Sequence, residues 1–164
     1  MIFAFAGRHD VGFAAVRHAL TLDPDHFPAH AALGHLYDRT GNPDAALDSD
    51  RSAHRLSGGN VLQLAFQGWV LGRTGRDDDA RQIVATIEQI ARSRHVPPCA
   101  FALVLAGVDD HDAAFHHLDR AYASRDVFLV MLTCAHWWDP LRSDRRFRSL
   151  LRRTGFLRVG TAAR

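Results

Sequence analysis

The chain contains no lysine, so all 20 of its basic residues are arginines. Cysteine is almost absent as well. The two that occur, Cys99 and Cys134, are far apart and stand among apolar residues. This spacing fits neither a zinc site nor a disulfide framework. We therefore expect two reduced, buried thiols in a cytoplasmic protein.

Long hydrophobic runs are also missing. The longest, VFLVMLTCAHWW, covers residues 127–138, which is too short for a membrane-spanning helix. The N-terminal MIFAFAGRHD has no basic segment ahead of its apolar start, so it does not resemble a signal peptide. The length and composition are those of a soluble protein with one domain or one short repeat array, and we expect no membrane partner.

Recognised catalytic and metal-binding motifs are absent too. The 11 histidines show no HExxH spacing, and the adjacent His116 and His117 diverge on a helix. The acidic run 77–79 stands at the expected start of a helix, where carboxylates interact favourably with free backbone amides. The pair Gly58–Gly59 lacks the lysine of a phosphate loop. We expect no metal site, no cofactor and no catalysis.

The arginines are unevenly distributed. From Asp139 to the C-terminus there are eight arginines and two aspartates, a net charge of +6, whereas residues 1–138 carry 12 arginines and 16 acidic residues, a net charge of −4. We expect most of these arginines only to cover the water-facing side of a helix whose apolar residues pack inward. The alternative is that the segment binds nucleic acid or an acidic partner, with nucleic acid not expected as the main partner. Its candidate anion-binding residues are Arg145, Arg146, Arg148, Arg152 and Arg153.

A spacing of 34 residues recurs along the chain. Each copy can be counted from one reference residue, which we call its origin. The four origins are Gly7, Gly41, Gly75 and Asp109. Small residues follow each origin after five positions: Gly12, Ala46, Ala80 and Ala114. Twelve positions after the origins come Ala19, Ala53, Ile87 and Ala121. Spacing in register over four copies is typical of a repeat architecture.

Each unit is expected to fold as two antiparallel helices. In the second unit, apolar residues form one stripe over 27–40, and Gly41 supplies the left-handed residue that ends a helix. Asn42 is a good N-cap and Pro43 suits the first position of the next helix, which we expect over 43–56. One such pair cannot bury its apolar stripe alone, but stacked pairs can.

These residues resemble the tetratricopeptide repeat (TPR) family, through LGHLY, TGNPDAAL and the alanine that follows. The resemblance covers residues 1–125, with a half repeat at 1–26 and repeats at 27–60, 61–94 and 95–125. It implies an all-α, right-handed solenoid of about three and a half repeats.

The C-terminal block, with AFHHLDRAYASRD and DPLRSDRRFRSLLRRTGF, resembles the end of TPR regions in bacterial signalling proteins and transcriptional regulators. The resemblance implies capping helices within 126–157, at about 126–134 and 144–154. The tail 158–164 is expected to be disordered. Trp137 and Trp138 are expected to seal the junction with the cap, or alternatively to mark a second partner surface.

The family resemblance also implies a function. TPR proteins bind a peptide or protein partner in a concave groove that is lined by the first helix of each repeat. Carried onto this chain, the partner-binding residues are His35, Asp38, Arg39, Trp69 and Arg73. The alternative is that Trp69 packs between repeats and that the arginines are merely solvated.

The N-terminal end of the array is expected to be open. Only MIFAFA stands where the first helix of the first repeat would be, so Phe13 and Val16 are expected to face outward. An exposed apolar surface of this kind is typical of a site that packs against another segment or protein. Either the chain belongs to a longer protein, or a second copy covers the edge and forms a homodimer.

Overall fold

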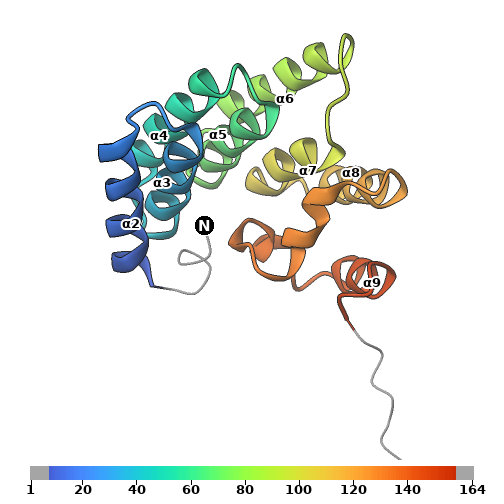
Figure 1. The fold of residues 1–164 in the computed structure, drawn as a ribbon. Coiled ribbons are helices and arrows are strands. Elements are labelled where there is room, and N and C mark those ends of the chain that lie inside the picture. Colours follow the sequence, from blue (N-terminus) through green and yellow to red (C-terminus); the bar gives the residue numbers. More distant parts are fainter. Residues whose placement is uncertain (1–7, 158–164) are drawn as a thin grey trace, which may run out of the picture.

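The computed structural model describes residues 8–157. The start of the half repeat and the tail 158–164 lie outside this range. Every regular element in 8–157 is a helix, which confirms the all-α class (Figure 1). The elements are α2 (His9–Leu22), α3 (Phe27–Arg39), α4 (Pro43–Leu56), α5 (Val61–Arg73), α6 (Asp77–Ala91), α7 (Pro98–Gly107), α8 (His111–Ala123), the 3₁₀ helices η1 (Val127–Thr133) and η2 (His136–Leu141), and α9 (Arg145–Arg153).

The helix boundaries follow the 34-residue period. Helices α2, α4, α6, α8 and α9 begin 34 residues apart, at His9, Pro43, Asp77, His111 and Arg145. Helices α3, α5, α7 and η2 end at the same interval, at Arg39, Arg73, Gly107 and Leu141. The C-terminal block therefore keeps the spacing of the units before it, although its first half consists of 3₁₀ helices.

The turns between paired helices share one backbone conformation. Gly41, Gly75 and Asp109 have φ angles of 76°, 78° and 56°, so the aspartate at the fourth origin takes the left-handed conformation of the glycines. Asn42 caps α4 as expected, because its side chain accepts a hydrogen bond from the Ala45 amide. The repeat pattern thus predicted a backbone feature that the residue type at position 109 disfavours.

Small residues mark the points where helices approach closely. Ala46, Ala80 and Ala114 are fully buried. A Cβ atom added to Gly68 would lie 2.7 Å from the Val104 side chain. A larger residue at position 68 would therefore force α5 and α7 apart.

Helices pack mainly against their neighbours in sequence, and α5 also packs against α7. One core extends from α4 to α9, and a smaller cluster joins α2 to α3. Val16 belongs to this smaller cluster, and the ring of Phe13 lies 5.1 Å from that of Tyr37. The expectation that both residues face outward is therefore wrong, because α3 covers them.

The C-terminal block departs from expectation in two respects. The region expected as a helix over 126–134 is a 3₁₀ helix, and Cys134 is exposed at its end, whereas Cys99 is buried as expected. Trp137 and Trp138 are fully buried, so they do seal the core. Within residues 8–157, no helix is long and apolar enough to cross a membrane.

The substitution Asp109→Gly should raise the free energy of unfolding by about 0.5 kcal/mol. A left-handed conformation costs an L residue on the order of 1 kcal/mol, and the freedom of glycine in the unfolded chain offsets part of the gain. The matched reversal, Gly75→Asp, should lower the free energy of unfolding. Urea denaturation measures both, and shifts of the same sign in the two variants would contradict the shared turn conformation.

Candidate functional site

Three of the five residues expected to line a peptide groove are buried, although Trp69 and Arg73 line a hollow of about 380 Å³. His35, Asp38 and Trp69 are buried, with 2–4% of each residue exposed. Arg39 is half-buried, and the side chain of Arg73 is 37% exposed. The structure brings Asp38, Trp69 and Arg73 into direct contact, and η2 of the same chain reaches the Asp38 carboxylate through His136.

The carboxylate of Asp38 is the centre of this cluster. It accepts a hydrogen bond from the Trp69 indole nitrogen at 3.1 Å and forms an ion pair with Arg73. The Nε2 atom of His136, on η2, is hydrogen-bonded to the same carboxylate. Burial raises the pKa of Asp38, but His136, Arg73 and Trp69 together outweigh this effect and hold the pKa below its usual value of 3.8. Asp38 is therefore a buried, ionised and fully partnered group.

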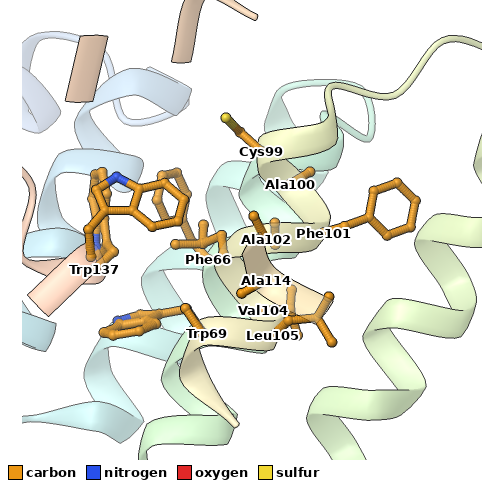
Figure 2. Packing of buried hydrophobic residues seen from close by; sticks show 14 of the residues in the cluster. Phe66, Trp69, Cys99, Ala100, Phe101, Ala102, Val104, Leu105, Ala114 and Trp137 are labelled. Carbon is orange, nitrogen blue, oxygen red and sulfur yellow. The ribbon is translucent and has the colours of Figure 1, made fainter. Parts of the chain in front are cut away.

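Aromatic rings close the space beside this carboxylate. The Trp137 ring lies 4.7 Å from Phe66 and 4.8 Å from His35 between ring centroids. Figure 2 shows Trp137 beside Phe66, with Trp69 on the same side of the core. Burial, followed by the nearby charge of His136, lowers the pKa of His35 to about 3. His35 is thus an uncharged core residue at physiological pH, whereas the family resemblance implied that it lines a partner-binding groove.

The η1–η2 segment is an integral part of the core. Leu132, Trp137, Trp138 and Leu141 are all fully buried. Burying each large apolar side chain stabilises a protein by about 1.5–3 kcal/mol, so removing the segment would cost roughly 6–12 kcal/mol. This cost is comparable to the whole stability of a typical domain. In the folded chain, the face of α3 at Asp38 is therefore covered by the protein itself.

The sequence interpretation missed His136. The residue lies 98 positions from Asp38 and belongs to no motif. One signal was available, because Asp38 stands on a helix with largely buried neighbours and such a carboxylate requires donors. That requirement predicts that partners exist, but it does not identify them.

A second aspartate, Asp50 on α4, is buried without such partners. Its Oδ1 atom has no hydrogen-bond partner among the described residues. A Cβ atom added to Gly34 would overlap this carboxyl group, so the two residues pack tightly across the α3–α4 contact. Burial, and then the charge of Asp38, raises the pKa of Asp50 well above 3.8. The two buried aspartates therefore have opposite electrostatic environments.

Two of the five candidate anion-binding arginines on α9 are already paired. Arg146 forms ion pairs with Asp112 and Asp144, and Arg153 forms one with Asp119. Their guanidinium groups also lie 4.2 Å from the ring centres of Phe115 and Tyr122, respectively. These contacts fasten α9 onto α8 and raise the pKa of Arg146 further.

The other three arginines of α9 remain available. Arg145, Arg148 and Arg152 are exposed and have no ion pair among the described residues. Their spacing of three and four residues places them on one face of the helix. Phe147 and Leu150 pack inward on the opposite side, as expected. We refer to Arg145, Arg148 and Arg152 as the arginine row.

Comparison with known proteins yields no relative: the sequence matches no family model, no curated protein and no solved structure. Within residues 8–157, no three histidine, cysteine or acidic side chains are grouped so that they could hold a metal ion. The chemistry of the site must therefore be argued from the Asp38 cluster and the arginine row themselves.

The substitution Asp38→Asn should lower the free energy of unfolding by about 2 kcal/mol at neutral pH, because it removes a buried charge with three partners. Since the pKa of Asp38 is lowered in the folded state, its contribution is present above pH 3.8 and is lost as the pH falls further. Urea denaturation over a pH series measures this effect. The control Asp48→Asn breaks an exposed pair with Arg51 and should cost less than about 0.5 kcal/mol.

The substitution Asp50→Asn should have the opposite effect and raise the free energy of unfolding by about 1 kcal/mol at neutral pH. Because the folded pKa is raised, the wild type loses stability as the pH rises above 3.8 towards that pKa. Asparagine is uncharged at every pH, so the variant should lack this loss. A destabilised variant with an unchanged pH profile would show that Asp50 is not a strained carboxyl group.

Proposed function

We propose that the protein is a TPR-like scaffold without catalytic activity, a right-handed solenoid that binds an acidic protein partner. By resemblance, it would form part of, or be related to, a bacterial signalling or transcriptional regulator. The observation that carries the choice of partner is the arginine row, three exposed cations on one helix face without acidic neighbours in contact.

Three features support the solenoid. Helix starts recur every 34 residues from His9 to Arg145, and the α5–α7 contact joins the first helices of two consecutive units. The left-handed residue recurs in the turns of three units. Stacked pairs of this kind bury a continuous core and leave long outer faces available to partners.

The arginine row is a better candidate surface than the concave face. Asp38 is buried under η2, so a peptide could reach it only after displacing several large apolar side chains, whereas Trp69 and Arg73 line a hollow of about 380 Å³. Arg145 and Arg152 require no such step. They stand about 10 Å apart along the helix axis, at 1.5 Å per residue.

This distance matches an acidic helix on the partner. Acidic residues at positions i, i+3 and i+7 of a helix span the same length and also share one face. Each guanidinium group can bind a carboxylate through two parallel hydrogen bonds. Because the pairs would lie at the surface, we expect binding that weakens with salt.

Nucleic acid is the second candidate, because phosphates can satisfy the same three arginines. In that case the logarithm of the binding constant should fall with the logarithm of the salt concentration with a slope of about −3, one unit for each phosphate contact. The acidic part of the chain, residues 1–138, disfavours a long DNA interface through repulsion.

Replacing all three arginines of the row by glutamine should weaken binding of a synthetic helical peptide with glutamates at i, i+3 and i+7. We expect at least a tenfold loss of affinity, about 1.4 kcal/mol, by fluorescence anisotropy at low salt. The matched control replaces Arg55 on α4, Arg81 on α6 and Arg92 at the C-terminal end of α6, which are exposed and form no ion pair among the described residues. It changes the net charge equally and should cost little affinity.

The same titration also includes the outcomes that would contradict binding at the arginine row. Equal losses in the two triple variants would show that only net charge matters, and the arginine row would then not be a site. Tighter binding of a short DNA duplex than of the peptide, abolished by the same triple variant, would favour nucleic acid as the ligand.

A further inference from the structure

A hollow on another part of the surface has features of a small-molecule site. It has a volume of about 360 Å³ and lies where the end of α6, the loop that follows and α8 meet. This volume is near the lower end for ligand pockets, about 300–1,000 Å³. The hollow is separate from the Asp38 cluster and the arginine row, and shares no residue with either.

The rim of the hollow is predominantly cationic. Arg94 and Arg120 line it together with His95, and none of them forms an ion pair among the described residues. Arg94 donates a hydrogen bond to the Gly59 carbonyl at 2.9 Å, which holds its guanidinium group near the loop. The one acidic residue of the lining, Glu88, is exposed on α6 and pairs with none of these groups.

The base of the hollow is flat and apolar. Phe101 and Val96 are buried, with 7% and 8% of their surface exposed. The His117 ring is stacked on Phe101, with 4.6 Å between centroids and 14° between ring planes. Burial, followed by the charges of Arg120 and His116, lowers the pKa of His117 to about 4. At physiological pH this ring is neutral and extends the apolar surface.

We propose that this hollow binds a small organic anion, with a flat apolar body against Phe101, His117 and Val96 and a carboxylate or phosphate group between Arg94 and Arg120. A free guanidinium group at a concave surface is well suited to planar anions. The apolar base supplies the affinity that an exposed ion pair alone lacks. The two parts of the lining therefore select one class of ligand, an amphipathic anion.

The test uses the full chain and four probes. Benzoate and phenyl phosphate carry both parts of the proposed ligand, whereas benzamide lacks the charge and inorganic phosphate lacks the apolar body. NMR of the His117 ring reports binding, because an anion beside Arg120 should raise the pKa of His117 and move its ring signals. We expect saturable shifts with at least one aromatic anion at millimolar concentration, about 4 kcal/mol of binding free energy.

A matched pair of variants locates the site. Arg120→Gln should weaken binding at least fivefold, while Arg81→Gln, which removes an exposed and unpaired arginine elsewhere, should leave it unchanged. Circular dichroism checks that both variants fold, and Arg94→Gln provides a second, independent loss of rim charge.

Three results would overturn the proposal. These are the absence of a saturable shift with either aromatic anion, equal binding of benzamide, and binding of inorganic phosphate as tight as that of phenyl phosphate. If benzoate and phenyl phosphate differ, the tighter one identifies the anionic group. The outcome is independent of the arginine row, because no residue is shared.

Discussion

The buried carboxylate of Asp38 is the constraint that ties α3 to the C-terminal block. An ionised group in a protein interior is tolerated only when donors surround it, and here the donors come from α5 and η2. His136 reaches Asp38 because η2 lies beside α3 and α5. This polar contact and the packing of Trp137 against His35 and Phe66 together place the C-terminal block, and the apolar burial is the larger contribution to stability.

The 34-residue period explains why local features were predictable and the long-range contact was not. The turn at Gly41, the cap at Asn42 and the buried alanines depend on residues a few positions apart, so each leaves a pattern in the sequence. The contact between Asp38 and His136 spans 98 residues, and either residue alone also fits a solvated role. A single sequence contains no information that pairs them.

The same contrast applies to the candidate surfaces. A helical wheel separates the inward side of α9 from its arginines. The prediction that Phe147 and Leu150 pack inward is confirmed. The wheel also places Arg146 and Arg148 about 200° apart, but it cannot show that Asp112 of α8 pairs with Arg146. The hollow beside Arg120 was missed for a related reason: its residues come from a helix end, a loop and another helix, and become neighbours only after packing.

The burial that makes η1–η2 part of the core has a consequence for the face of α3 that it covers. A peptide that reached Asp38 would first have to offset roughly 6–12 kcal/mol of apolar burial. Charged side chains that have no internal ion pair lie instead on outer faces of the described part of the chain. On α9, Arg146 and Arg153 form ion pairs with Asp112 and Asp119. The three arginines of the arginine row form no ion pair among the described residues, and they give their face of the helix a positive charge.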